Sequence, residues 1–190
     1  MFLSKLCIQS FRNIDSIEIC FDKQLNIIYG ENAQGKTSIL EAIYYLALTK
    51  SFRANNEVIA LKYNQDFFDI EGEFINDEGS EFRIRVYYSQ KENKHIFYNE
   101  NQIRKFSEIV GIVPVILLSL EDLDISYGIP AKRRRFLDIL LSQVNPLYLQ
   151  ALQIYKRSLQ NRNKLLKDIK DGQASPEALF PWNKQLCEYG

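Results

Sequence analysis

Two glycines, a lysine and a threonine are spaced along the sequence as in a phosphate-binding loop. Residues 30–37 read G-x-x-x-x-G-K-T, a pattern in which the backbone N–H groups of a tightly curled loop converge on phosphate oxygens. Lys36 can reach the β- and γ-phosphates, and the Thr37 hydroxyl can ligate Mg²⁺. We therefore predict that ATP and Mg²⁺ bind, with Thr37 on the metal, at Gly30, Glu31, Asn32, Ala33, Gln34, Gly35, Lys36, Thr37 and Ser38.

The segments on either side of this loop have the periodicity that a strand–loop–helix unit requires. Residues 25–29 form a short apolar run, which predicts a buried strand. Residues 38–47 place apolar side chains at helical spacing and contain neither Gly nor Pro, which predicts a helix. The positive end of that helix dipole would face the bound phosphates.

Arg12 is a second candidate for a phosphate contact. It lies in a turn between two segments, residues 6–8 and 17–21, whose apolar residues alternate with polar ones and predict half-buried strands. A guanidinium one hairpin upstream of the loop could meet the γ-phosphate. The alternative is that Arg12 is only a surface turn residue.

The middle of the chain changes to short alternating segments separated by turns. Residues 68–74, 82–86 and 96–98 alternate in this way, which predicts an antiparallel meander. An antiparallel layer beside a nucleotide-binding sheet is, by fold analogy, an arrangement of the ABC type. The sequence thus predicts an α/β fold: a P-loop NTPase head of the ABC-ATPase type with an antiparallel β subdomain over residues 1–127, followed by a short helical arm or lobe over residues 128–190.

A further apolar run, residues 113–118, precedes Glu121 and Asp122. An apolar strand that ends in these two acids would be a Walker B motif, in which carboxylates serve Mg²⁺ and the attacking water. Two intervening residues and Pro114, which suits a strand edge or start, argue against this interpretation. We favour a loop that senses the nucleotide from beside the site.

Charge is balanced overall but is distributed unevenly. Residues 1–130 hold 13 Lys and Arg against 19 Asp and Glu, whereas residues 131–170 hold 10 against 2. The basic segment begins with a cluster at a predicted helix start, which is a candidate DNA-binding surface made of Lys132, Arg133, Arg134 and Arg135. A solvated basic helix explains the same pattern equally well.

Composition argues against a membrane-spanning or secreted protein. No apolar run approaches the ~20 residues that a membrane span needs, and residues 1–5 do not resemble a signal peptide. These features predict a cytoplasmic protein with no membrane partner. Three cysteines, far apart and without a C-x-x-C pair, indicate neither a disulfide framework nor a zinc site.

The order of these blocks resembles the bacterial recombination mediator family RecF along essentially the whole chain. The resemblance rests on residues 11–13, 30–44, 50–53, 121–138, 160–165 and 181–182. Proteins of this family are similar to the heads of SMC and Rad50 proteins, which are ABC-type ATPases. Ala33 stands where the family often has Gly, a replacement that should be tolerated if the φ of that residue is negative.

The resemblance implies a role in DNA replication, repair and the SOS response. It implies ATP-dependent homodimerisation, binding to duplex DNA near single-strand gaps, and cooperation with RecR and RecO in loading the recombinase. Relatives are roughly twice this length, and their signature motif and Walker B acids lie outside these residues. We therefore identify no catalytic residue and expect inefficient ATP turnover from this chain, although the complete protein would be an ATPase.

Two other functions share the phosphate-binding loop. The first is the nucleotide-binding subunit of a membrane transporter, against which the basic arm and the missing transporter signature argue. The second is a nucleotide-gated protein-interaction module, in which ATP only orders a protein-binding surface. Charge reversal in the basic cluster would separate this module from a DNA-binding protein.

Overall fold

The computed structural model describes residues 1–54, 56–119 and 124–190. These residues pack as two units, 1–117 and 118–190. The predicted division between residues 127 and 128 falls within the second unit.

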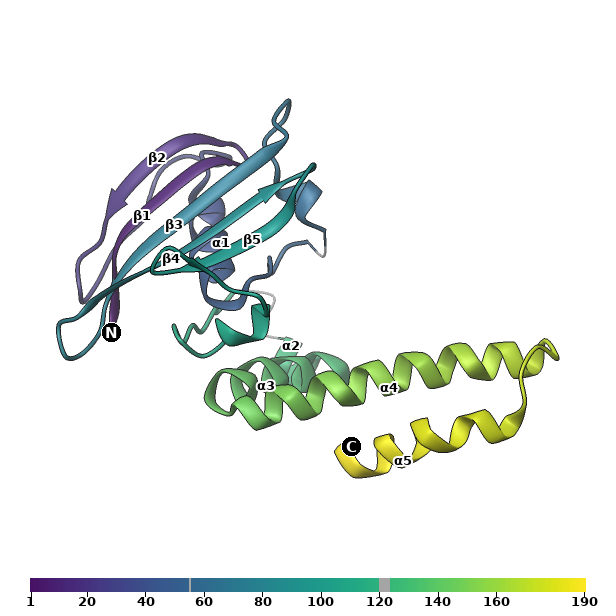
Figure 1. The fold of residues 1–190 in the computed structure, drawn as a ribbon. Helices are drawn as coiled ribbons and strands as arrows, with labels where there is room; N and C mark the ends of the chain where they lie inside the picture. The colour runs from purple at the N-terminus through teal and green to yellow at the C-terminus, as the bar shows by residue number, and fades with distance from the viewer. Residues whose placement is uncertain (55, 120–123) are drawn as a thin grey trace. The chain divides into compact units, whose positions relative to one another are not determined.

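The first unit is built on one six-stranded antiparallel sheet with the order β2-β1-β3-β4-β5-β6 (Figure 1). The predicted meander is confirmed in β3 to β5, and the two predicted N-terminal strands join the same sheet instead of forming a separate nucleotide-binding layer. The strands are β1 (Phe2–Phe11), β2 (Ile14–Cys20), β3 (Phe67–Ile75), β4 (Glu81–Ser89), β5 (Asn93–Tyr98) and β6 (Asn101–Gln102).

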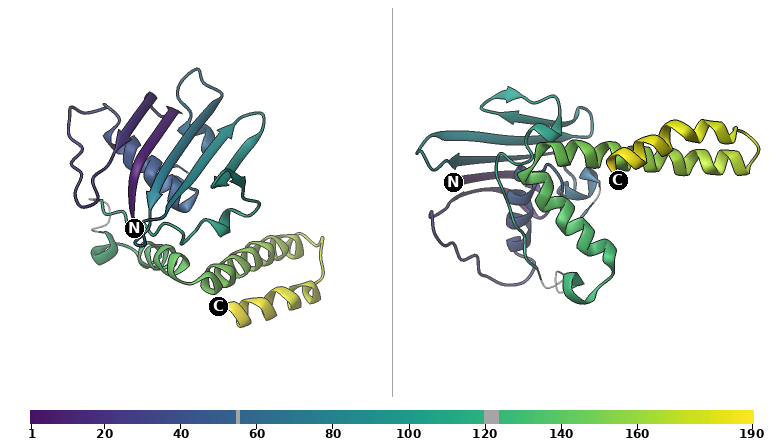
Figure 2. Two further views of the ribbon diagram at one scale, coloured as in Figure 1. Left: turned by 60° about the vertical axis from the view of Figure 1, so that its left-hand side comes forward. Right: turned by 90° about the horizontal axis from the view of Figure 1, so that it is seen from below.

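The sheet has one buried face because apolar residues alternate along its strands. Phe68, Ile70 and Phe74 of β3 are buried, and Ile84 and Val86 of β4 continue the same layer. Period-two alternation sends these side chains to one side of the pleat. Helix α1 (Lys36–Leu48) packs on that face (Figure 2). No described helix of the first unit packs on the opposite face, which we call the open face.

Helix α1 is the predicted helix, and its C-terminal half closes the core. Tyr45 is 1% exposed and meets Phe11 and Phe68 edge-on, with ring centroids 6.3 and 5.7 Å apart. Burial raises the pKa of Tyr45, and the neighbouring carboxylate of Glu57 raises it further. Lys94 binds that carboxylate at 2.6 Å, so the charge beside the core is paired.

The predicted buried strand at residues 25–29 is not formed. Leu25, Ile27 and Tyr29 are 73%, 74% and 90% exposed, and the segment has no strand partner among the described residues. An apolar run becomes a strand only where a neighbouring chain pairs with its N–H and C=O groups. The prediction is therefore wrong. Residues 21–35 instead form a long loop outside the sheet (Figure 2).

The second apolar run, residues 113–118, behaves in the same way. It has no assigned strand, and Ile116 and Leu118 are 74% and 83% exposed, although Val113 is buried. Glu121 and Asp122, on which the Walker B interpretation depended, lie outside the described residues.

The second unit is helical, as predicted. Pro130 and Pro146 occupy first helical turns, where their missing N–H has no cost. The Asn145 side chain caps the long helix by accepting from the amides of Leu147 and Tyr148. The elements are α2 (Asp124–Tyr127), α3 (Pro130–Val144), α4 (Pro146–Lys170), η4 (Pro176–Leu179) and α5 (Phe180–Tyr189).

Polar side chains hold α5 against α4. Ser158, fully buried, donates to Gln185 Oε1 at 2.6 Å, and the Arg162 Nε donates to Asn183 Oδ1 at 2.8 Å. The predicted arm is therefore a helical hairpin within this unit. Among the described helices, none combines the length and the apolar character that crossing a bilayer would require.

Gly72 should be intolerant of a side chain. A Cβ at this position of β3 would lie 2.7 Å from Leu46 Cδ1 and 2.8 Å from Phe74 Cε2, both in the packed core. Overpacking of this kind costs about 1–3 kcal/mol, so we expect Gly72→Ala to lower the free energy of unfolding in urea by that amount. Ser16→Ala, on the exposed edge strand, is the control and should change it by less than about 0.5 kcal/mol. An unchanged midpoint for Gly72→Ala would contradict this packing.

Candidate nucleotide-binding site

The loop before α1 has the backbone conformation that its glycines permit. Gly30 and Gly35 have φ of 148° and 96°, which is the region that L side chains rarely adopt. A Cβ on Gly30 would lie 2.8 Å from Gln34 Oε1, and one on Gly35 would lie 3.3 Å from Asn13 Oδ1. Glycine is therefore favoured at both positions chiefly by the backbone conformation of the loop.

Ala33 also has a positive φ, 66°, so the condition under which alanine would replace glycine without strain is not met. A left-handed conformation costs an alanine roughly 1–2 kcal/mol because its Cβ crowds the following carbonyl. A hydrogen bond helps to hold Ala33 in this conformation: its carbonyl accepts from Asn13 Nδ2 at 2.7 Å. The strain is thus local to the segment that would surround a phosphate.

The first turn of α1 is electropositive. Gly35 is its N-cap, no side chain caps the helix, and the turn contains no acidic residue. The free N–H groups of a helix start and the dipole together favour an anion. Lys36 adds a full charge, and its Nζ donates to the carbonyls of Gly30 and Glu31 at 2.9 and 2.5 Å. The ammonium is therefore held over the curl of the loop.

A cavity of about 560 Å³ lies against this helix start. Several predicted nucleotide-binding residues line it, whereas Gly30, Glu31 and Gln34 do not. Its lining is Arg12, Asn13, Asn32, Ala33, Gly35, Lys36, Thr37, Ser38, Arg53, Ile59 and Leu61. The loop, the β1–β2 turn and the segment after α1 thus meet at one hollow.

Asn13 ties the loop to the helix. Its amide nitrogen donates to Ala33, as above, and its Oδ1 accepts from the Ser38 hydroxyl at 2.9 Å. Ser38 is buried with its hydroxyl engaged in this bond, so its side chain acts on the shape of the site. The site predictions omitted Asn13, although the motif of residues 11–13 could have identified it.

Glu41 is the charged residue around which the cavity wall is assembled. It is 0% exposed, and its carboxylate accepts from Arg12 Nη2 at 2.6 Å and from Arg12 Nε at 3.0 Å. The Ser51 hydroxyl donates to the same carboxylate at 2.5 Å. Arg12 Nη1 also donates to the Ile59 carbonyl at 2.7 Å, so the guanidinium is fixed on all sides.

Arg53 approaches the same carboxylate more loosely. Its Nη1 lies 3.4 Å from Glu41 Oε2 and its side chain is 45% exposed at the cavity. Arg12, by contrast, is 14% exposed. The predicted γ-phosphate contact of Arg12 stays a prediction, and Arg53 is a second cation that the site predictions did not include. Glu41 is the common partner of Arg12 and Arg53. The sequence did not indicate this role, because Glu41 lies within a helix and belongs to no motif that marks a buried charge.

The residues present fit ATP and Mg²⁺. The cradle that a Cβ would fill at Gly30 and Gly35 suits a phosphate, and Thr37 is exposed at the cavity with an oxygen suited to Mg²⁺. Within the described residues, no group of three or more His, Cys, Asp or Glu side chains could hold a metal.

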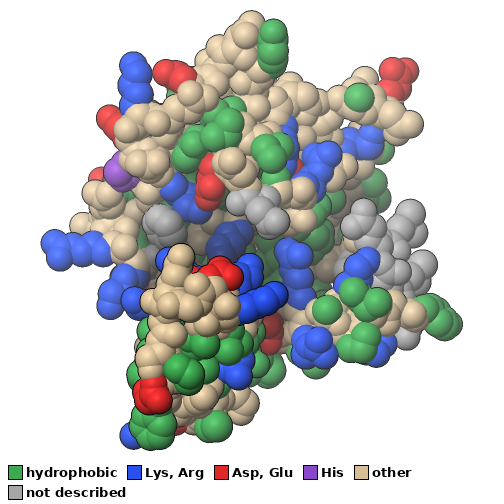
Figure 3. Space-filling model, turned by 90° about the vertical axis from the view of Figure 1, so that its right-hand side faces the viewer, with side chains coloured by type: hydrophobic (Ala, Val, Ile, Leu, Met, Phe, Trp, Pro, Cys, Tyr) green, Lys and Arg blue, Asp and Glu red, His purple; other side chains and the backbone are tan. Residues whose placement is uncertain are grey.

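The four basic residues predicted to bind DNA open α3, in the second unit. All four are exposed, and Arg133 is partly committed because its Nη1 donates to the carbonyl of Gly128 at 3.3 Å. Figure 3 shows one face of the molecule, on which Lys and Arg side chains stand at the surface beside hydrophobic ones.

Removing the buried carboxylate should destabilise the first unit strongly. Glu41→Ala leaves Arg12 nearly buried without its counter-charge, and breaking a buried pair in this way costs about 3–5 kcal/mol. We expect a loss of this size in urea unfolding. Glu78→Ala, in an exposed turn, is the control and should be neutral within about 0.5 kcal/mol. A loss below about 1 kcal/mol for Glu41→Ala would mean that the arginines do not depend on it.

Comparison with known proteins gives a consistent family. The model of the AAA ATPase domain family matches residues 1–177. The DNA replication and repair protein RecF of Chloroherpeton thalassium is 42% identical over 98% of this chain and 50% of its own length. RecF of Salinibacter ruber is 37% identical over 100% of this chain and 47% of its own. The chain thus spans about half the length of the curated relatives that it matches.

Solved structures agree with the sequence comparison. A structure described as the recombination mediator RecF with ATP, in the RecFOR pathway, is 33% identical and has a TM-score of 0.91 over 100% of this chain and 51% of that one. A structure from work on SMC ATPases shares the fold: it is 20% identical with a TM-score of 0.62, and the match covers 74% of this chain and 99% of that one. The chain therefore belongs to the AAA ATPase domain family, and along its whole length it is similar to RecF proteins.

Proposed function

We propose that this chain is the ATP-binding half of a RecF-type DNA repair protein, which binds duplex or gapped DNA in an ATP-dependent manner and helps to load the recombinase at gaps. The observation that carries the proposal is the curled loop at the uncapped, electropositive start of α1. The similarity to RecF proteins over the whole chain supports the DNA-repair role.

ATP would bind with its phosphates in the loop of residues 30–37. Lys36 would exchange the carbonyls of Gly30 and Glu31 for phosphate oxygens, and Thr37 would hold Mg²⁺. Arg12 is placed by Glu41 at the cavity wall, within the same hollow as the loop. The loose contact of Arg53 leaves it able to turn toward an anion.

DNA would be bound electrostatically by residues 132–135. Arg134 and Arg135 are exposed at the start of α3, and the segment of residues 131–170 carries 10 basic residues against 2 acidic ones. Phosphate contacts of this kind supply affinity without sequence preference. Homodimerisation, cooperation with RecR and RecO, ATP turnover and a cytoplasmic location are parts of the same proposal that concern the complete protein.

The competing functions are weaker. A transporter subunit is not favoured, because the relatives that match this chain are RecF proteins. A nucleotide-gated module that binds only proteins shares the loop geometry and is distinguished by its indifference to DNA.

Lys36→Ala tests nucleotide binding. The change removes the charge that would meet the phosphates, and a charge-assisted hydrogen bond is worth about 1.5–3 kcal/mol, so we expect ATP affinity by calorimetry to fall by roughly 10- to 100-fold. Lys50→Ala, exposed beyond the C-terminal end of α1, is the control and should bind ATP as the wild type does. Equal affinity in both variants would show that the loop is not used.

Charge reversal at Arg134 and Arg135 tests DNA binding. The double variant should weaken binding to gapped duplex and lower the slope of log affinity against log salt by about 2, because each phosphate contact contributes about 1. Reversal of the exposed Lys50 and Lys91 in the first unit is the matched control. DNA affinity that does not change with ATP, or that survives the reversal, would contradict the proposal.

A further inference from the structure

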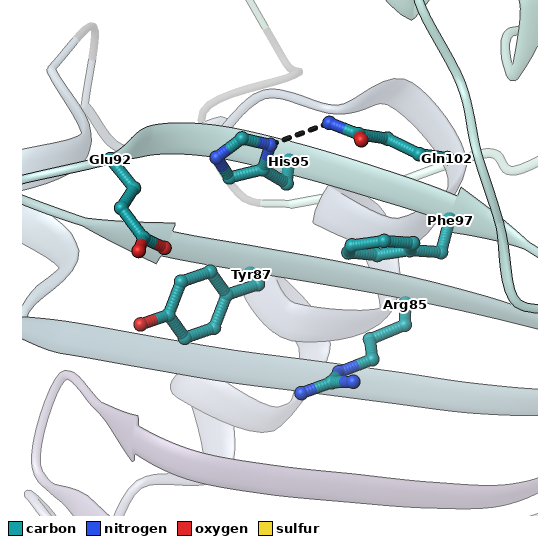
Figure 4. Close-up of a pocket in the computed structure, with 6 residues that line it drawn as sticks. All are labelled: Arg85, Tyr87, Glu92, His95, Phe97 and Gln102. Atoms are coloured by element: carbon teal, nitrogen blue, oxygen red, sulfur yellow. Dashed lines mark hydrogen bonds between the residues drawn. The ribbon is translucent and has the colours of Figure 1, made fainter.

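A second pocket lies on the open face of the sheet, opposite α1 and away from the phosphate-binding loop. Its volume is about 620 Å³. Strands β4, β5 and β6 and the β4–β5 turn supply its lining, which is shown in Figure 4 and consists of Arg85, Tyr87, Glu92, His95, Phe97 and Gln102.

Strand register builds the pocket from four side chains at the corners of a square. Arg85 pairs with Phe97 and Tyr87 with His95 across the β4–β5 ladder. Residues two apart on each strand share a face, so all four side chains project to the same side. His95 is half-buried, and its Nδ1 lies 2.7 Å from Gln102 Nε2. This hydrogen bond fixes one wall.

Aromatic rings form the floor of the pocket, and one of them already lies against a cationic side chain of the protein. The guanidinium of Arg85 lies over the Phe97 ring at 5.8 Å from its centroid. Tyr87 stacks on Phe67 with centroids 6.1 Å apart, which fixes its ring. In Figure 4 the carboxylate of Glu92 lies beside the Tyr87 ring. An aromatic face with an adjacent carboxylate is the environment that binds ammonium and guanidinium groups.

The charges around the pocket favour a cationic ligand. Arg85 is paired with Asp69, Arg83 with Glu71 and Glu73, and Lys5 with Glu18. Glu92 makes no ion pair with any described residue, and its neighbour Lys91 does not line the pocket. The charge left without a partner in the lining is therefore negative, which disfavours a phosphate.

We propose that this pocket receives a lysine or arginine side chain from a basic segment of a protein partner. The incoming cation would lie against the exposed face of Tyr87 and pair with Glu92, while its aliphatic stem would pack along Phe97. The surface is distinct from the nucleotide site and makes no use of the basic residues of α3. It assigns the open face of the sheet to protein recognition.

The test uses N-acetyl-arginine amide as the probe and N-acetyl-citrulline amide as its neutral match in shape. His95 is the only histidine in the 190 residues, so its imidazole proton signals, assigned by their loss in His95→Gln, report on the pocket wall. We expect a saturable shift with the arginine probe at millimolar concentration and about tenfold weaker binding of citrulline, since both the cation–π contact and the ion pair are lost.

Variants locate the binding. Glu92→Gln removes the charge without changing the shape and should weaken the arginine probe about fivefold. Tyr87→Leu should do the same by removing the ring, whereas Tyr87→Phe should retain binding. The control is Glu78→Gln, in the exposed turn between β3 and β4, which should bind as the wild type does.

Two results would overturn the proposal. The first is a shift of equal size with citrulline, or one that is unchanged in Glu92→Gln. The second is a His95 shift with short oligothymidylate at lower concentration than with the arginine probe, which would make the face a platform for stacking bases. Should Tyr87→Leu fail to fold, as judged by circular dichroism, the Glu92→Gln result alone decides.

Discussion

The buried carboxylate of Glu41 is the interaction on which the nucleotide site depends. A fully buried charge is costly unless it is paired and hydrogen-bonded, and here Arg12, Arg53 and Ser51 meet that requirement. These residues come from the β1–β2 turn and from the segment after α1. Satisfying one carboxylate therefore brings both segments to the helix that carries the phosphate-binding lysine.

The two arginines of this network are held with different firmness. Arg12 is fixed by Glu41 and by the Ile59 carbonyl, so it is a rigid part of the wall. Arg53 makes one long contact and remains half exposed. A fixed cation costs little reorganisation when an anion arrives, whereas a loosely held one can change partner. This difference gives the site both a pre-formed shape and a group that can respond to the ligand.

The loop itself shows how local strain is retained near a ligand. Ala33 holds a left-handed backbone where glycine would be relaxed, and Asn13 stabilises it by joining the loop carbonyl to Ser38 of α1. Strained positions persist only where surrounding contacts over-determine them. The two faces of the sheet then differ in chemistry: the buried face carries α1, and the open face carries paired charges and half-buried aromatic rings.

The sequence by itself determined what is local. The spacing of Gly30, Gly35 and Lys36 fixed the loop, alternation fixed the meander, and Pro130, Asn145 and Pro146 fixed the helices of the second unit, because each of these signals acts within a few residues. Only the tertiary structure decided that Glu41 joins Arg12 to Arg53 and that Arg85 lies over the Phe97 ring, since these contacts join segments whose separation carries no pattern. It also decided that residues 25–29 stay exposed, because apolar character alone does not make a strand without a neighbour to pair with its backbone.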